Sequence, residues 1–216
     1  INIKDVPYKT LRKILSNTKK RKYLRKKLKT LEIDKDNPLK GILLIQMFEK
    51  SSLRTRLSFY LAIRQLGGSA LTLRPDELHL SKGGESLSDT AKILSTYGDI
   101  FVLRTDNEKK LNSFKKFLSI PLINGLSPNS HPAQILSDIF TIEEITKKNI
   151  SRLNICWIGD SNNVLNSLIE ASIKFSFKLN IGCPKNYNPP SEMLRMIRQK
   201  SSKIKIFNSP KVAIKN

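Results

Sequence analysis

The chain of 216 residues carries 39 lysine and arginine residues against 18 aspartate and glutamate residues, a formal net charge of +21 at pH 7. No apolar run approaches the roughly 18–20 residues that a membrane-spanning helix needs, and two cysteines are too few for a disulfide framework. These properties argue against membrane-spanning and disulfide-stabilised classes and indicate a globular protein of one large domain or two modest ones. Cys156 and Cys183 share no metal-ligand spacing, so each is expected to be a small buried apolar residue in a reducing cytoplasm.

The densest positive charge lies at 19–29, with the sequence KKRKYLRKKLK. Such a run fits either an anionic partner such as nucleic acid or a solvated face produced by a lysine-rich composition. Because Tyr23 is the one aromatic residue in the run that could stack on a base, the solvated face is favoured. The first residues lack the positive-then-apolar pattern of a secretory signal, so a cytoplasmic location is expected.

Short apolar runs alternate with helical periodicity along the chain. The predicted strands are 41–48, 69–73, 99–104, 120–123, 153–158 and 178–182. The predicted helices are 5–30, 53–66, 86–96, 107–117, 132–147, 162–175 and 190–200. Apolar strands separated by helices predict an α/β fold of parallel βαβ units, with helices on both faces of each sheet.

A polar, turn-like segment at 147–151 separates a long predicted helix from a new apolar strand. The prediction is therefore two doubly wound parallel-sheet domains joined by a connecting helix, with the second domain incomplete at about three strands. The predicted limits are 1–130 for the first domain, 131–149 for the connecting helix and 150–216 for the second domain. Such folds bind ligands beyond the carboxyl ends of their strands.

The segment 48–56 (FEKSSLRTR) leads from the first predicted strand into a helix. Ser52 suits the N-cap, and Gly67 with Gly68 supplies the stop. The predicted buried face of this helix is Phe59, Ala62, Ile63 and Leu66. Hydroxyls and arginines around the first turn of a helix favour a phosphate group, although the same residues also fit a capped helix with surface arginines.

The run FEKSSLRTRLSF resembles the signature of the aspartate/ornithine carbamoyltransferase family. Similar motifs follow in the same order: QLGG at 65–68, GES..DTA.ILS at 84–95, PLINGLS at 121–127, HPAQILSD at 131–138 and WIGDSNN at 157–163. The similarity covers nearly the whole chain and leans towards the ornithine enzymes. It implies transfer of the carbamoyl group of carbamoyl phosphate to the side-chain amine of L-ornithine, giving L-citrulline and phosphate.

The resemblance also implies a set of site residues. It assigns carbamoyl phosphate to Ser52, Leu53, Arg54, Thr55, Arg104, His131 and Gln134. Of these, Arg104, His131 and Thr55 are the catalytic candidates, because their hydrogen bonds can stabilise the carbonyl oxygen as it becomes negative. Asn163, in an element similar to Gly-Asp-x-Asn-Asn, is the candidate contact for ornithine. No metal and no cofactor is expected, since an acyl phosphate is already activated.

Some positions depart from the family pattern. Leu53 stands where Thr is usual, which removes a hydroxyl but keeps the backbone N–H. Tyr60 stands where Glu is usual, so Arg56 lacks the carboxylate partner that this Glu would provide. Arg56 is expected to brace the loop. Lys82 fits either a solvated loop lysine or the loop lysine of aspartate enzymes, and His79 is left without a role.

Members of this family are longer than this chain, and the resemblance implies further ornithine contacts after residue 216. The chain alone is therefore expected to bind carbamoyl phosphate weakly and to turn over poorly. A complete version is expected to form a homotrimer that serves arginine biosynthesis, without a nucleic-acid or membrane partner. Two alternatives stay open: a carbamoyltransferase for aspartate or another amino acid, and a non-catalytic degenerate subunit or basic nucleic-acid-binding protein.

Overall fold

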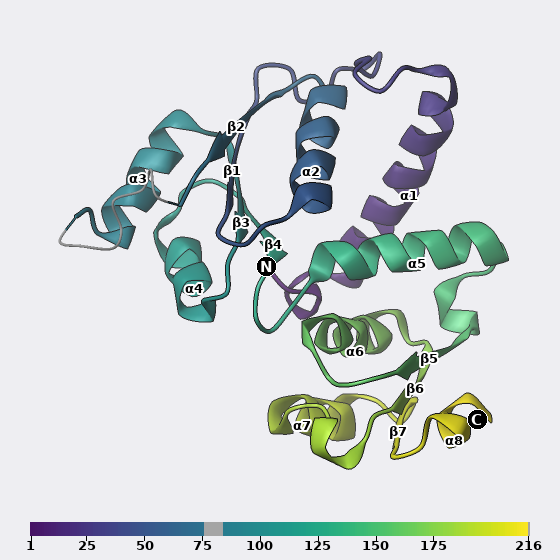
Figure 1. Ribbon diagram of the computed structural model, residues 1–216. Helices are drawn as coiled ribbons and strands as arrows, with labels where there is room; N and C mark the ends of the chain where they lie inside the picture. Colours follow the sequence, from purple (N-terminus) through teal and green to yellow (C-terminus); the bar gives the residue numbers. More distant parts are fainter. Residues whose placement is uncertain (76–83, 216) are drawn as a thin grey trace. The chain divides into compact units, whose positions relative to one another are not determined.

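The computed structural model describes residues 1–75 and 84–215, which fold into two compact units (Figure 1). One unit is formed by residues 20–128, and the other by residues 1–19 together with 129–216. The first nineteen residues and the helix that follows residue 131 thus belong to the same unit as the C-terminal sheet. The division of the chain into functional domains remains a prediction.

The unit of residues 20–128 is built on a four-stranded parallel sheet in the order β2-β1-β3-β4. Its strands are β1 (Leu43–Phe48), β2 (Ser69–Leu73), β3 (Ile100–Arg104) and β4 (Leu122–Leu126). Its helices are α2 (Leu53–Gln65), α3 (Leu87–Tyr97) and α4 (Glu108–Phe117). Because α2 covers one face of the sheet and α3 and α4 cover the other, the predicted doubly wound arrangement is confirmed (Figure 1).

The core of this unit has one layer on each face of its sheet. Leu44, Ile63 and Val102 form the buried cluster beneath α2. Elsewhere in the unit the rings of Phe101 and Phe114 pack with their centroids 5.3 Å apart. The predicted apolar face of α2 is only partly right, because Ile63 is buried whereas Ala62 is exposed.

The other unit holds a three-stranded parallel sheet in the order β5-β6-β7. Its elements are α5 (Pro132–Thr146), η3 (Ile150–Arg152), β5 (Asn154–Ile158), α6 (Asn163–Phe175), β6 (Lys178–Gly182), η4 (Lys185–Tyr187), α7 (Ser191–Lys200), β7 (Ile204–Phe207) and α8 (Pro210–Lys215). Helices α6 and α7 lie on one face of the sheet and α8 on the other (Figure 1). Fully buried Ile169, Phe177 and Leu179 lie in one continuous apolar core.

The predicted helix 5–30 is wrong as a single helix. The structure has a 3-10 turn η1 (Ile3–Asp5), the helix α1 (Tyr8–Leu24) and a second 3-10 turn η2 (Arg25–Lys27). Val6 is extended, with φ −100° and ψ 130°, because the residue before a proline avoids the helical region, and Pro7 follows it.

The predicted strand 120–123 is displaced, because β4 starts at Leu122 and continues through Gly125 to Leu126. A glycine would ordinarily end such a strand, but a Cβ on Gly125 would lie 3.2 Å from the Val102 Cγ1 atom. Glycine therefore permits close packing here instead of a turn. The sequence ranges also omitted β7 and α8, which are only four and six residues long.

The two cysteines differ from each other. Cys183 is buried as predicted, and this burial raises the pKa of its thiol. Cys156 is exposed, contrary to the prediction, because alternate residues of the edge strand β5 face outward. None of the described helices has the length and apolar character required to cross a membrane.

Candidate functional site

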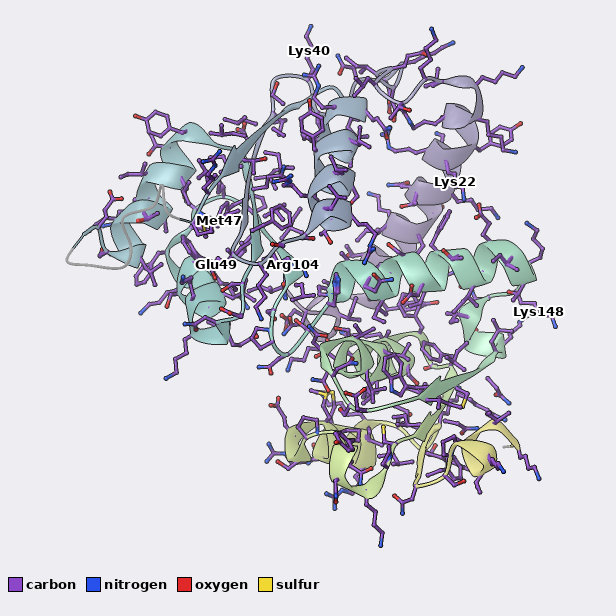
Figure 2. The ribbon with its side chains drawn as sticks, in the orientation of Figure 1. Lys22, Lys40, Met47, Glu49, Arg104 and Lys148 are labelled. Carbon is purple, nitrogen blue, oxygen red and sulfur yellow. The ribbon has the colours of Figure 1, made fainter. Side chains whose placement is uncertain are left out.

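Strands β1 and β3 are neighbours in the sheet, and Phe48 pairs with Arg104 at their carboxyl ends. This register brings the segment that follows β1 next to the Arg104 side chain, which Figure 2 labels. The Arg104 Nη1 atom donates to the Ser52 Oγ atom at 3.0 Å and to the Thr55 Oγ1 atom at 3.3 Å. Three of the predicted site residues are thus brought together by the sheet topology and the start of α2.

Ser52 occupies the predicted N-cap position of α2, but its hydroxyl forms no capping hydrogen bond to the helix. The hydroxyl oxygen accepts from Arg104 instead. The backbone N–H groups at the start of a helix carry partial positive charge and need acceptors. An anionic ligand can supply these acceptors at the start of α2.

Arg104 is a half-buried donor group beside this helix start. Its Nε atom is buried and has no hydrogen-bond partner among the described residues. The β3–β4 pairing skips one residue here, so that Arg104 pairs with Leu126, whose φ of 145° is strained for a residue with a side chain. The extra residue, Gly125, belongs to β4, and a β-bulge of this kind bends the strand that carries it.

The first turn of α2 is open to solvent. Leu53 is 67% exposed, and Arg54 is exposed without a hydrogen bond or ion pair to any other described residue. Arg54 can therefore bind an anion without first breaking an internal contact. Arg56 is also exposed and pairs with no described side chain, so the predicted bracing of the loop does not occur.

Sequence reasoning overlooked Glu49, which precedes this segment. Its carboxylate accepts hydrogen bonds from the Thr105 hydroxyl and the Lys110 ammonium group. In the sequence Glu49 is recognised only as part of the family motif, although a carboxylate directly after a buried strand also indicates a polar network at this edge of the sheet.

His131 and Gln134 belong to the other unit. His131 is the N-cap residue of α5 with Pro132 at the first helical position, and its backbone N–H donates to the buried Ser167 hydroxyl at 2.8 Å. The Gln134 Nε2 atom donates to the Asp138 Oδ1 atom at 2.8 Å, one turn along α5. This bond leaves the amide oxygen of Gln134 as the group that can accept from a ligand.

Asn163 is the first residue of α6 and is half-buried. The cap of α6 is its neighbour Asn162, whose Oδ1 atom accepts from the backbone N–H groups of Val164 at 2.9 Å and Leu165 at 3.2 Å. Because Asn162 performs the structural task, the Asn163 side chain is not needed to cap the helix.

The basic run 19–29 contains both paired and exposed cations. Arg21 and Arg25 each form an ion pair with the buried carboxylate of Asp34. Arg21 also donates to Asp36, and this hydrogen bond lowers the pKa of Asp36 below its usual value. The lysines of the run lie on the exposed surface.

Two residues considered in the sequence, His79 and Lys82, lie outside the described residues. Within residues 1–75 and 84–215, no group of three or more His, Cys, Asp or Glu side chains is arranged to hold a metal ion.

Two family models match consecutive parts of the chain. The carbamoyl-P binding domain of aspartate/ornithine carbamoyltransferase matches residues 1–144, and the Asp/Orn binding domain matches residues 151–216. An ornithine carbamoyltransferase of Rhizorhabdus wittichii is 38% identical over 97% of this chain, and that of Oleidesulfovibrio alaskensis is 37% identical over 98%. The chain spans 67% of the length of each of these two relatives.

The chain also superposes on solved structures of ornithine carbamoyltransferases. The ornithine carbamoyltransferase from Pyrococcus furiosus superposes with a TM-score of 0.90 at 32% identity, over 98% of this chain and 67% of that protein. The anabolic ornithine carbamoyltransferase from Campylobacter jejuni superposes with a TM-score of 0.82 at 32% identity, over 96% of this chain and 67% of that protein.

Proposed function

This chain belongs to the aspartate/ornithine carbamoyltransferase family and is a carbamoyltransferase of the ornithine type, and we propose that it binds carbamoyl phosphate at Arg104 and the start of α2. The reaction transfers the carbamoyl group from carbamoyl phosphate to the side-chain amine of L-ornithine. It yields L-citrulline and phosphate.

The observation that carries the proposed site is the arrangement of Arg104, Ser52 and Thr55. The guanidinium group is held against both hydroxyls through Nη1, while its buried Nε atom lacks an acceptor among the described residues. A buried donor without an acceptor costs free energy, so a ligand that supplies one is bound more tightly. A dianionic acyl phosphate supplies several oxygen acceptors and neutralises the charge.

Each residue at the start of α2 then has a chemical task. Arg54, the Ser52 hydroxyl and the backbone N–H of Leu53 bind the phosphate group, and they stabilise it as it leaves. Arg104 and the Thr55 hydroxyl donate to the carbamoyl oxygen, on which negative charge develops when the amine attacks. Positioning the two reactants supplies much of the remaining acceleration, and no covalent intermediate is required.

We assign three residues of the other unit to the same reaction. His131 donates to the carbamoyl oxygen, and the Gln134 amide oxygen accepts from the carbamoyl amino group. Asn163 contacts the amino-acid end of ornithine. The two matched family models, over residues 1–144 and 151–216, cover these three positions and support the assignments.

We further propose residues 1–130 as the carbamoyl-phosphate domain, 131–149 as the connecting helix and 150–216 as part of the ornithine domain. The two matched family models, over residues 1–144 and 151–216, support the start of the ornithine part near residue 150. We also propose a cytoplasmic homotrimer in arginine biosynthesis. The family resemblance supports the trimer, the anabolic relative from Campylobacter jejuni supports the pathway, and two cysteines without a disulfide support the location.

The Arg54→Ala variant tests the phosphate site. Loss of an exposed bidentate donor should weaken carbamoyl-phosphate binding by at least about 100-fold, or about 2.8 kcal/mol. Isothermal titration calorimetry of the variant against the unaltered chain measures this loss. Arg64→Ala is the matched control, since Arg64 is an exposed arginine in the last turn of the same helix. Near-normal binding by Arg54→Ala would remove α2 from the site.

The acceptor is tested separately with radiolabelled carbamoyl phosphate and either L-ornithine or L-aspartate. Label should enter citrulline with ornithine and should not enter carbamoyl-aspartate. Turnover with aspartate alone would assign the chain to the aspartate enzymes instead.

The Asn163→Ala variant should lower citrulline formation without changing the affinity for carbamoyl phosphate.

A further inference from the structure

The side chain of Glu49 is almost entirely enclosed, although it lies only three residues before Ser52. It is 12% exposed, and it accepts hydrogen bonds from the Thr105 hydroxyl and the Lys110 ammonium group. Thr105 directly follows Arg104 and is fully buried, while Lys110 lies on α4. The carboxylate therefore connects the start of the segment 48–56, hereafter called the phosphate segment, to both sides of the β3–α4 turn.

Backbone contacts reinforce this connection. The Glu49 N–H donates to the Arg104 carbonyl at 2.9 Å, which continues the β1–β3 pairing beyond the strand. The Thr105 hydroxyl oxygen also accepts from the Asn107 N–H at 3.1 Å, so that the turn after β3 is fixed on the same hydroxyl. Glu49 and Arg104 lie at the same end of the sheet in Figure 2.

We propose that Glu49, fixed by Thr105 and Lys110, is a positioning residue that holds Arg104 against Ser52 and Thr55 for the carbamoyl group. This inference rests on the proposed carbamoyl-phosphate site. Arg104 keeps its orientation through one nitrogen on two hydroxyls, so a small shift of the phosphate segment relative to β3 would move the guanidinium from its ligand. A displacement of about 1 Å is enough to reduce activity strongly in a positioned site.

Lys110 has a second effect in this arrangement. An unneutralised carboxylate near the start of α2 would repel the dianionic substrate, and the Lys110 ammonium group cancels that charge. Lys110→Met should therefore impair binding more than the double variant Glu49→Gln/Lys110→Met, which removes both charges.

The chain contains a matched comparison on the same two segments. Lys50 and Asp106 form an ion pair of 3.6 Å between the residue after Glu49 and the residue after Thr105. Their side chains are 56% and 60% exposed, and exposed pairs contribute little. Asp106→Asn thus removes an ionic link of the same sequence span without disturbing an enclosed carboxylate.

The experiment titrates the 216-residue chain with carbamoyl phosphate and, separately, with inorganic phosphate. Glu49→Gln should weaken carbamoyl-phosphate binding by about tenfold, because the Arg104 donors move from the carbamoyl oxygen. Inorganic phosphate lacks that oxygen, so the affinity for it should change by less than about threefold, since Arg54 and the start of α2 remain. Asp106→Asn should leave both affinities unchanged.

The ratio of the two affinities separates positioning from a general loss of structure, because the folded fraction cancels from it. If Glu49→Gln leaves the ratio unchanged, or if Asp106→Asn lowers it equally, the positioning role is wrong. If the unaltered chain binds neither probe, the proposed function itself fails. Should Glu49→Gln not fold, Glu49→Gln/Lys110→Met provides the same ratio test without an unpaired charge.

Discussion

Helices α2 and α6 hold equivalent places in the two units and yet are built differently. Each has thirteen residues and follows the first strand of its sheet, and each carries predicted site residues at its start. Nine residues of α6 are buried, whereas Ile63 is the one buried residue of α2. The side chain of Asn162 caps α6, while the Ser52 hydroxyl at the same position of α2 is bonded to Arg104.

Two helices in the same topological position thus differ at their first turns: the side chain of Asn162 caps α6, whereas no side chain caps the start of α2, where we propose that the ligand binds. Helix α6 holds the unit together, and its buried polar residues fix neighbouring backbone: Ser167 accepts from His131, and Glu170 accepts from Lys4. Helix α2 has one buried residue, and its first turn, where we propose that an anion binds, is open to solvent. Changes in α6 should therefore affect stability, and changes at the start of α2 should affect binding.

The largest expected effect comes from removing a core side chain of α6. Ile169→Ala deletes apolar atoms from a fully buried site and should lower the free energy of unfolding by about 2–5 kcal/mol. Chemical denaturation followed by the fluorescence of Trp157, the single tryptophan, measures this change in its own unit.

Leu57→Ala on α2 is the counterpart, because Leu57 is 46% exposed. Its cost should be within about 0.5 kcal/mol, measured by circular dichroism during denaturation. If both substitutions cost the same, the contrast between the two helices is wrong.

The next effect, about 1 kcal/mol, concerns the two N-cap residues. Asn162→Ala removes an acceptor of two backbone N–H groups and should destabilise its unit by about 1 kcal/mol. Ser52→Ala removes no cap and should cost less than about 0.5 kcal/mol of stability, but it should weaken carbamoyl-phosphate binding by about threefold to tenfold. Denaturation and titration of both variants test whether Asn162 contributes to stability and Ser52 to binding. A Ser52→Ala variant that loses stability and keeps its affinity would contradict it.

The limits of α2 and α6 could be predicted from the sequence, because apolar periodicity and nearby glycine and asparagine residues are local signals. The hydrogen-bond partner of each N-cap side chain could not be predicted from the sequence. Ser52 is bonded to Arg104, which lies 52 positions away in the sequence, and only the β1–β3 register brings the two together. Local rules rank Ser and Asn as equivalent caps and contain no information on distant donors.

The same limit explains why Glu49 was overlooked. Its partners Thr105 and Lys110 follow 56 and 61 positions later, on a neighbouring strand end and helix. The resemblance to a family supplied the site residues that motifs record, but Thr105 and Lys110 stood outside every motif considered. A polar residue after one parallel strand should thus be compared with the residues after the adjacent strand.

The smallest effect concerns the buried carboxyl of Glu170 in α6. Burial raises its pKa above the usual value, although the backbone N–H of Lys4 opposes this shift. The unfolded chain therefore releases this proton at lower pH than the folded chain. The stabilising contribution of the group is complete below the ordinary carboxyl pKa and declines as the pH rises through the raised value. Glu170→Gln keeps an acceptor for the Lys4 N–H and abolishes this decline.

Thermal unfolding of Glu170→Gln and the unaltered chain across a pH series should show a stability difference that shifts in favour of the variant as the pH rises. Glu192→Gln is the matched control, because Glu192 also pairs with Lys4, at 3.5 Å, but is 63% exposed. Its curve should run nearly parallel to that of the unaltered chain, since exposed pairs contribute little. Parallel curves for Glu170→Gln would mean that α6 accommodates this carboxylate as readily as solvent does, and the contrast between a core helix and a ligand-binding helix start would then rest on apolar burial alone.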